Sequence, residues 1–299
     1  MDRLKGFFLA MIAAMLWGVS GTFGQFLFHE REISIEWLLT MRLLISGIGL
    51  LLYAQFGERS HLFEVWRDKG DALQLIVFSI TGILAVQYTY FAAIKHSNAA
   101  TATVLQYAGP VIIAIYLACK NRKAPTLLEL AAITLAVLGT FLLVTHGNAN
   151  RLSISGTALF FGIASAIALA TYTLQPIRLL SKYKPSVIMG WGMLVGGIVF
   201  SFVKAPWDIE GIWDLKTYGY TVFIIIFGTL IPFQAYLTAV QMIGGQKTSL
   251  LASVEPLSAA VLAVVWLHVS FSTMDWIGSL FIISTVFLLS KGSPKEVRE

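Results

Sequence analysis

Long apolar stretches, separated by short polar segments, run through the whole chain. Each approaches the ~20 mostly apolar residues that a helix needs to cross the hydrocarbon core of a bilayer. Ten stretches qualify, and they cover approximately residues 6–28, 35–53, 72–93, 99–118, 126–144, 154–174, 187–203, 220–239, 248–269 and 274–289. This pattern predicts an all-α integral membrane protein with ten transmembrane helices.

The second half of the chain repeats the first. A shift of 146 residues superimposes three pairs of residues and a shift of about 150 superimposes a fourth: Tyr90 with Tyr236, Leu105 with Leu251, Pro110 with Pro256, and Gly47 with Gly197. Each half holds five stretches, and because five is odd, the second half must cross the membrane in the opposite sense. The sequence therefore predicts two inverted five-helix repeats, at residues 1–145 and 154–290, with a basic tail at 291–299. Such repeats are typical of transporters.

Composition supports the membrane assignment, and the distribution of charge sets the expected orientation. Hydrophobic residues make up 57% of the chain and charged residues 12%, against roughly 45–50% and ~25% in soluble proteins. With a cytoplasmic N-terminus, fifteen Lys and Arg residues fall in cytoplasmic segments and five in external loops, in line with the positive-inside rule. We expect a multi-pass protein of the cell (plasma or inner) membrane with both termini in the cytoplasm.

The sequence carries no signal for a cofactor, a metal or nucleic acid. Cys119 is the only cysteine, and the five histidines are scattered without metal-binding spacing. Gly244 to Thr248 resembles a phosphate-binding loop, but Gln246 stands where that loop requires glycine. The net charge of +5 follows from the loop bias, and no basic cluster is interleaved with exposed aromatics to bind nucleic acid. We expect neither an enzyme nor a nucleic-acid-binding protein.

Several short motifs carry a family resemblance. They are Trp17-Gly18 in the first stretch, Arg42 in the second, Tyr-Phe-Ala-Ala-Ile-Lys-His-Ser-Asn-Ala-Ala at 90–100, Pro110 in the fourth stretch and Glu255-Pro256 in the ninth. On these motifs the chain resembles the EamA domain of the drug/metabolite transporter superfamily, twice and over nearly its whole length. The resemblance implies ten helices around a central cavity, in a family that moves amino acids, amines, other metabolites or drugs, often outward and without ATP hydrolysis.

The chain departs from the family pattern at one place in each half. Many members have a Gly-Glu pair after the fourth and ninth helices, where this chain has Lys120-Asn121-Arg122 and Leu267-His268. No role of that glutamate can therefore be transferred to this chain.

Glu255 and Arg42 are the charged residues expected inside the membrane. A carboxylate at this depth costs roughly 2.5–3.5 kcal/mol, so Glu255 should face a cavity or a partner. It could couple transport to protons, neutralise a substrate ammonium, or form a structural hydrogen bond or ion pair beside Pro256. Arg42 could extend to the membrane surface, bind a substrate carboxylate, or pair with an acid such as Glu36.

Two prolines and a set of aromatic and amide side chains complete the candidate site. Pro110 and Pro256 each remove a backbone hydrogen bond, which suits paired hinges or static bends. On the fourth stretch Thr103, Gln106 and Tyr107 share one helical face with Pro110 and should look inward. With Glu255, the candidate substrate-binding residues are Trp17, Gln87, Tyr88, Gln106, Tyr107, Tyr172, Trp191, Gln234 and Tyr236. Stacking on a substrate and ordinary packing or interfacial anchoring both explain such aromatics.

These features favour a secondary transporter that moves a small polar metabolite by alternating access through a central cavity. An amino acid or related amine is the favoured substrate, because one acid, one base and an aromatic wall suit a zwitterion. Export is the direction that the family resemblance implies. The alternative is a multidrug or organic-cation (quaternary-amine) transporter of the same fold, which would use Glu255 without Arg42. Proton coupling, the substrate and the oligomeric state are left open.

Overall fold

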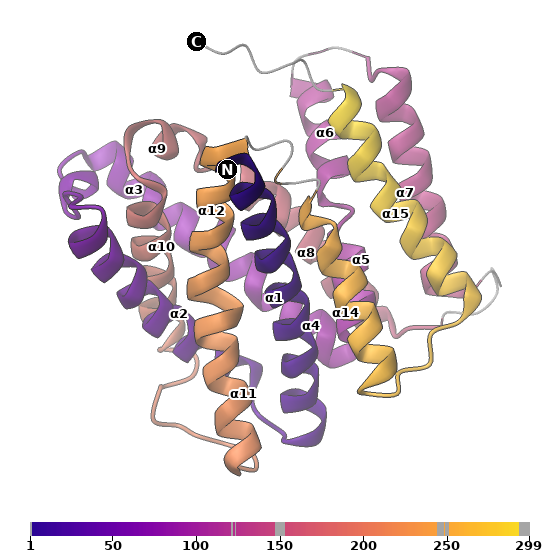
Figure 1. Ribbon diagram of the computed structural model, residues 1–299, viewed down its shortest axis with the longest axis horizontal. Helices are drawn as coiled ribbons and strands as arrows, with labels where there is room; N and C mark the ends of the chain where they lie inside the picture. Colours follow the sequence, from indigo (N-terminus) through magenta and orange to yellow (C-terminus); the bar gives the residue numbers. More distant parts are fainter. Residues whose placement is uncertain are drawn as a thin grey trace.

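The structure is a computed structural model that describes residues 2–120, 122, 124–146, 153–243, 248 and 251–292. Residues 244–247, where the sequence resembles a phosphate loop but departs from its pattern, lie outside the described residues, as do most of the junction between the halves and the tail at 293–299. The described part of the chain forms helices joined by loops and turns, without a strand. Figure 1 shows the arrangement.

The helices of each half follow the apolar stretches, with short π and 3-10 segments between some of them. In the first half they are α1 Asp2–Glu30, α2 Ile35–Leu52, η1 Tyr53–Gly57, η2 Glu64–Trp66, α3 Lys69–Val77, η3 Phe78–Leu84, α4 Ala85–His96, α5 Ala99–Gln106, α6 Gly109–Lys120 and α7 Leu127–Thr145. In the second half they are α8 Gly156–Leu174, α9 Ile177–Lys182, α10 Pro185–Phe200, α11 Leu215–Ile225, η4 Ile226–Leu230, α12 Ile231–Ile243, α14 Val254–Val265 and α15 Thr273–Gly292.

Six helices among the described residues are long and apolar enough to cross a membrane. They are Leu4–Glu30, Ile35–Gly57, Lys69–His96, Ala99–Lys120, Gly156–Lys182 and Leu215–Val240. Four shorter apolar helices accompany them, at Leu127–Leu143, Pro185–Phe200, Val254–Val265 and Thr273–Leu288. The prediction of an all-α membrane protein is confirmed, while the count of ten spans and the inverted repeat remain predictions.

The fourth and ninth stretches are interrupted helices. After α5 ends at Gln106, a turn at Tyr107 and Ala108 precedes α6, and a turn at Ser253 precedes α14. Pro110 and Pro256 each lie in the first turn of the following helix. Backbone N–H groups in the first turn have no intrahelical acceptor, so a proline there costs no hydrogen bond. The prolines therefore begin new helical segments rather than bend continuous ones.

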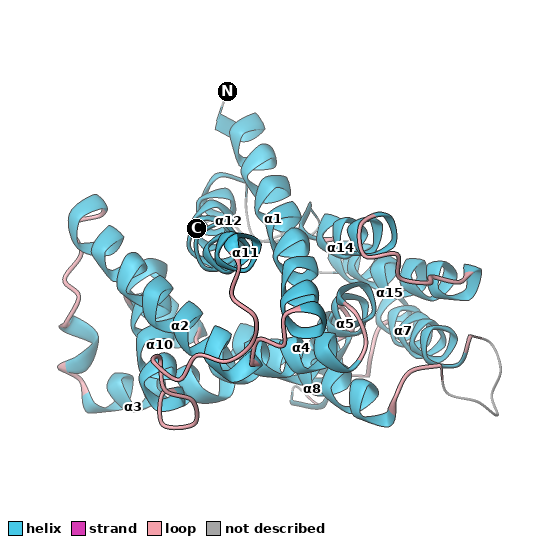
Figure 2. Ribbon diagram, turned by 90° about the horizontal axis from the view of Figure 1, so that it is seen from below, coloured by secondary structure: helices cyan, strands magenta, loops and turns pink. Residues whose placement is uncertain are grey.

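Helices from the two halves pack directly on one another. α2 pairs with α10 and α7 with α15, while the contact of α4 with α8 is matched by that of α12 with α1. Seen along the helices, α2, α3 and α10 lie on one side and α7 and α15 on the other, with α1, α4, α5 and α8 between them (Figure 2). If the two halves were exchanged, the pairs of α2 with α10 and of α7 with α15 would be reproduced, and the pair of α4 with α8 would become that of α12 with α1.

Glycines allow the closest of these approaches. A Cβ on Gly47 of α2 would lie 2.6 Å from the backbone nitrogen of Leu194, and one on Gly197 of α10 would lie 3.0 Å from that of Leu44. Since Gly47 and Gly197 are repeat mates, the contact is made in the same way from both sides. Membrane helices associate through such close backbone packing, because lipid offers no hydrophobic drive between them.

Candidate substrate site around Glu255

Glu255 lies at the start of a helix, next to the interruption of the ninth stretch. It occupies the first turn of α14 and is half-buried. A carboxylate in this position is favoured by the positive end of the helix dipole and by the free N–H groups of the first turn. Local structure thus lowers the cost of placing an acid within the apolar bundle.

Tyr107, from the interruption of the fourth stretch, contacts Glu255. Its hydroxyl lies 3.2 Å from Glu255 Oε2 and 2.6 Å from the backbone oxygen of Ala252. A tyrosine has one hydroxyl proton, so it donates to one of these acceptors at a time. The two interrupted helices therefore meet through side chains at their breaks, one from each half of the chain.

Two further tyrosines approach the same carboxylate. Tyr90 of α4 and Tyr236 of α12, which are repeat mates, both lie close enough to Glu255 for electrostatic interaction. The Tyr90 hydroxyl is 2.8 Å from Thr103 Oγ1, and the ring of Tyr236 is 5.3 Å from that of Trp17. Tyr107 contacts the acid, Tyr90 and Tyr236 lie near it, and both halves of the chain therefore contribute tyrosines to this region.

Helix α1 closes one side of this cluster through Trp17 and Gly18. A Cβ on Gly18 would lie 2.8 Å from the backbone oxygen of Glu255, so only glycine permits α1 to approach α14 this closely. The ring of Trp17 also lies 5.3 Å from that of Phe233, in an edge-on contact. The Trp17-Gly18 motif thus places the Trp17 ring against α12 and brings the backbone of α1 close to that of α14 at Glu255.

Arg42 is buried within the bundle beside the cluster. Its side chain is held at η4, where Nε donates to Thr229 Oγ1 and Nη2 to the backbone oxygen of Gly228 at 3.1 Å. A π segment shifts the regular hydrogen-bond ladder by one residue, which leaves a carbonyl available for such a donor. The guanidinium also lies over the ring of Phe91, 4.9 Å from its centre. Arg42 and Glu255 are near enough for their charges to interact.

The side-chain oxygens of Gln87 and Gln234 accept no hydrogen bond from the described residues. Both Oε1 atoms are buried and have no hydrogen-bond partner among the described residues, which is costly for a polar atom. Gln87 lies on α4 and Gln234 on α12, the helices that carry Tyr90 and Tyr236. Such acceptors are suited to the N–H groups of a bound molecule.

Other predicted site residues pack elsewhere or at the edge of this cluster. Tyr172 lies near Tyr236, but its hydroxyl points to Met189 Sδ at 3.5 Å and its ring stacks on Phe78. The half-buried Gln106 ends α5 one residue before Tyr107.

The contacts of Trp191 and Tyr88 are with residues other than those around Glu255. Trp191 Nε1 donates to the backbone oxygen of Leu62 at 2.8 Å, and its ring packs against Trp66. The Tyr88 hydroxyl is 3.5 Å from Glu36 Oε1. These contacts support the packing interpretation for both residues.

The sequence prediction did not include Tyr90 in the site, although its alignment with Tyr236 was a usable signal. It also missed Gly228 and Thr229, the partners of Arg42. Nothing in the local sequence marks these two residues, because their contact with Arg42 depends on how η4 packs against α2.

Helical membrane architecture and a polar cluster between interrupted helices define a multi-pass membrane transporter. The EamA-like transporter family matches residues 4–145 and again residues 156–291. The chain belongs to this family, and because its members are transporters, the expectation that the chain is not an enzyme is confirmed.

Individual relatives agree with this assignment. The chain is 41% identical to an uncharacterized inner membrane transporter, YicL, of Salmonella typhimurium, over 98% of both proteins. It is 22% identical to the threonine/homoserine exporter RhtA of Escherichia coli, covering 85% of this chain and 80% of RhtA. A solved crystal structure with 17% sequence identity shares the fold, with a TM-score of 0.63 and 96% coverage of both chains.

Proposed function

We propose that the chain is a secondary transporter for an amino acid or a related small amine, bound at Glu255 and exported by alternating access. The observation that carries the proposal is the half-buried carboxylate of Glu255 among Tyr90, Tyr107 and Tyr236. A carboxylate and aromatic faces together favour an ammonium group. The free acceptors on Gln87 and Gln234 would take its remaining N–H groups.

The comparison with RhtA supports the choice of substrate class. RhtA is named as an exporter of threonine and homoserine, which are zwitterions with a primary ammonium group. In this chain Arg42 supplies a second, positive charge near Glu255, which suits the carboxylate of such a molecule.

The interrupted helices supply a route to alternating access. Tyr107 and Glu255 join the two breaks, and each break leaves a short helix free to tilt relative to its neighbour. Protonation of Glu255 would remove the charge that holds an ammonium, so the same residue could couple release of substrate to uptake of a proton.

Transport of organic cations is the second candidate, and the hydrogen bonds of Arg42 favour it. The guanidinium is already bound to Thr229 and Gly228 and stacked on Phe91. If those contacts persist during transport, Glu255 alone selects the substrate, and a quaternary amine would be accepted without a carboxylate.

A ligand screen separates these two functions. Binding to the folded state raises the midpoint of thermal unfolding by mass action. We expect detergent-purified protein to be stabilised by an amino acid such as threonine or homoserine and less by quaternary ammonium compounds. The reverse order would select the organic-cation function.

The Glu255→Gln variant tests the role of the carboxylate. We expect the flux driven by a proton gradient in proteoliposomes to fall by about tenfold or more in this variant, because Gln cannot take up and release the proton that the carboxylate transfers. The thermal midpoint should be nearly unchanged, since Gln can accept the Tyr107 hydrogen bond. Gradient-driven flux equal to that of the parent protein would remove Glu255 as the coupling group.

A further inference from the structure

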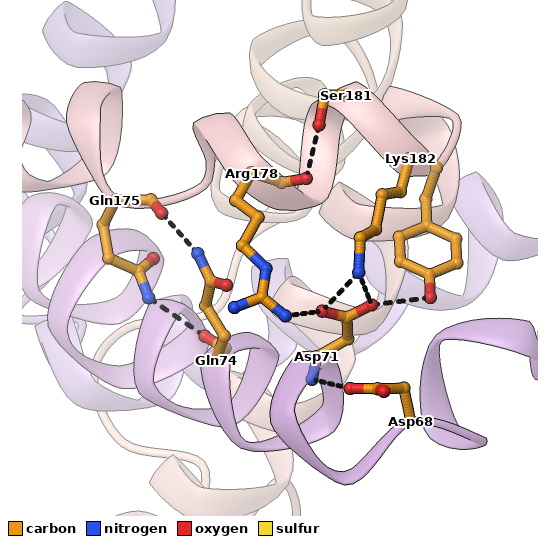
Figure 3. Close-up of polar contacts among 8 residues, drawn as sticks. Asp68, Asp71, Gln74, Gln175, Arg178, Ser181 and Lys182 are labelled. Atoms are coloured by element: carbon orange, nitrogen blue, oxygen red, sulfur yellow. Dashed lines mark hydrogen bonds and ion pairs between the residues drawn. The ribbon is translucent and has the colours of Figure 1, made fainter.

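A buried acid joins the two halves at one end of the bundle. Asp71, at the start of α3, is 1% exposed in its side chain. Its Oδ1 accepts from Arg178 Nη2 at 2.8 Å, and its Oδ2 accepts from Lys182 Nζ at 2.8 Å and from the Tyr183 hydroxyl at 2.9 Å. Figure 3 shows two of these three donors, Arg178 and Lys182, converging on the carboxylate. All three belong to α9 or its C-cap, in the second half of the chain.

A second polar contact reinforces the same junction. Gln74 Nε2 donates to the backbone oxygen of Gln175 at 2.8 Å, and Gln175 Nε2 donates back to that of Gln74 at 3.0 Å. The pair lies beside Asp71 (Figure 3). Together these five side chains form what we call the Asp71 latch: Asp71, Gln74, Gln175, Arg178 and Lys182.

The opposite end of the bundle carries a matching ion pair. Arg31, just after α1, places Nη2 3.3 Å from Oδ2 of Asp214, the N-cap of α11. In Figure 1 the start of α11 lies at the lower end, whereas α3 and α9 lie at the upper end. The backbone N–H and hydroxyl of Thr217, and then Arg31, hold the pKa of Asp214 below its ordinary value, so it stays charged near neutral pH.

This second junction contains more than its ion pair. The backbone nitrogen of Ile212 donates to the Arg31 oxygen at 2.8 Å, and Trp37 Nε1 donates to the Pro206 oxygen at 2.8 Å. We call the contacts of Arg31, Trp37, Pro206, Ile212 and Asp214 the Asp214 latch.

The two latches correspond to one another in the duplicated chain. In each, an acid at the start of the third long helix of one half pairs with a base that follows the first long helix of the other half. Exchange of the halves turns one latch into the other and moves it to the opposite end. An inverted repeat that rocks between two states would separate one latch while keeping the other.

We propose that the Asp71 and Asp214 latches are the two gates of the transporter, each closing one end of the bundle and opening in alternation. This inference rests on the proposed alternating-access function. The polar contacts of both latches are formed in this structure.

The gates differ in their dependence on one residue. The side chain of Asp71 is 1% exposed and is enclosed by its partners, whereas the side chain of Asp214 is 44% exposed and is supported by backbone contacts. A buried charge is costly when unpaired, so the Asp71 latch stays closed only while its donors remain. Loss of the Asp71 charge weakens the contacts of all three donors at once, so it should open its end more than loss of the Asp214 charge opens the other, where the backbone contacts remain.

The experiment measures access from each end with thiol reagents, and it needs no substrate. In a Cys119→Ser background, a Met189→Cys reporter on α10 tests the Asp71 end and a Thr221→Cys reporter on α11 tests the Asp214 end. Both positions are at most 5% exposed. We expect Asp71→Asn to raise the maleimide labelling rate of the first reporter by about tenfold and not to raise that of the second.

Asp68→Asn is the matched control, because Asp68 lies three residues away and caps α3 within its own half. It should leave both rates unchanged. If Asp71→Asn does not fold, as judged by size-exclusion chromatography, the Arg178→Gln/Lys182→Gln variant decides, since it changes only the exposed partners. Unchanged labelling of the Met189→Cys reporter in the folded variant, or an equal rise at both reporters, would overturn the gates.

The outcome is separable from the proposed function. Unaltered labelling together with intact amino-acid flux would reject the gates and leave the transport function standing. A rise at one end together with no flux of any tested amine would support the gates and reject the substrate class.

Discussion

Glu255 carries a charge at a depth where charge is expensive, and its place at the start of α14 explains how the bundle tolerates it. The first turn of α14 offers free N–H groups to the carboxyl group, the Tyr107 hydroxyl lies 3.2 Å from it, and Arg42 is near enough for their charges to interact. Sequence alone could name Glu255 as unusual, but the structure identifies Tyr107 as its neighbour. Arg42, by contrast, is bound mainly to backbone and hydroxyl groups of η4.

Replacement of Arg42 by lysine tests whether this residue is structural. Lysine keeps the charge but cannot make the forked contact to Thr229 and Gly228. We expect Arg42→Lys to lower the free energy of unfolding by ~1.5–3 kcal/mol, measured by thermal unfolding in detergent. Arg67→Lys, at an exposed loop position, is the control and should have little effect.

A stable Arg42→Lys variant that has lost amino-acid binding while keeping the binding of organic cations would contradict this expectation. Arg42 would then be a ligand of the substrate carboxylate rather than a support for η4.

At the scale of the helices, hydrophobic periodicity located the spans but not their interruptions. A proline predicts a local break in hydrogen bonding, and Pro110 and Pro256 do mark the interrupted stretches. It does not reveal that the chain leaves the helix at Tyr107 and at Ser253, before each proline. At the first of these turns the Tyr107 hydroxyl reaches across the bundle to Ala252 and Glu255, which lie beside the second.

The contact of α7 with α15 depends on two facing glycines. A Cβ on Gly139 would lie 2.6 Å from the backbone oxygen of Gly278. We expect Gly139→Ala to lower the free energy of unfolding by about 1–3 kcal/mol, as overpacking does, measured by thermal unfolding. Gly219→Ala on α11 is the matched control, since a Cβ there meets nothing within 4 Å. If the two variants had the same free energy of unfolding, the close contact between α7 and α15 would not contribute to stability, and the prediction would be wrong.

At the scale of the molecule, the basic segments gather at one end. The start of α1 and the end of α15 both lie at the upper end in Figure 1, together with α3, α6 and α9. Arg178 and Lys182 of the Asp71 latch are among the positive residues that were expected to be cytoplasmic. In the structure these two residues bind Asp71, which the positive-inside pattern did not predict.

The native cysteine reports the orientation without any substitution. Cys119 is exposed near the end of α6, beside Lys120. Because the positive-inside rule places this end in the cytoplasm, we expect a membrane-impermeant maleimide to label Cys119 in inside-out vesicles but not in intact cells. Labelling in permeabilised cells is the control for reactivity. Labelling in intact cells would reverse the predicted orientation.

The sequence by itself determined the class of protein and its duplicated design. A bilayer demands long apolar helices, because no water is present to satisfy backbone groups, so composition and period reveal them directly. Glu255, Arg42 and the prolines stood out for the same reason, as groups that are costly in that setting. The family of transporters also followed from short motifs.

Only the tertiary structure decided which polar side chains meet. Tyr107 reaches Glu255, Arg42 reaches Thr229, and Asp71 reaches three donors more than a hundred residues away. Trp191 belongs instead to a separate aromatic cluster. These pairings depend on how closely helices approach at glycines such as Gly18, and that distance is set by packing between segments that are remote in the chain.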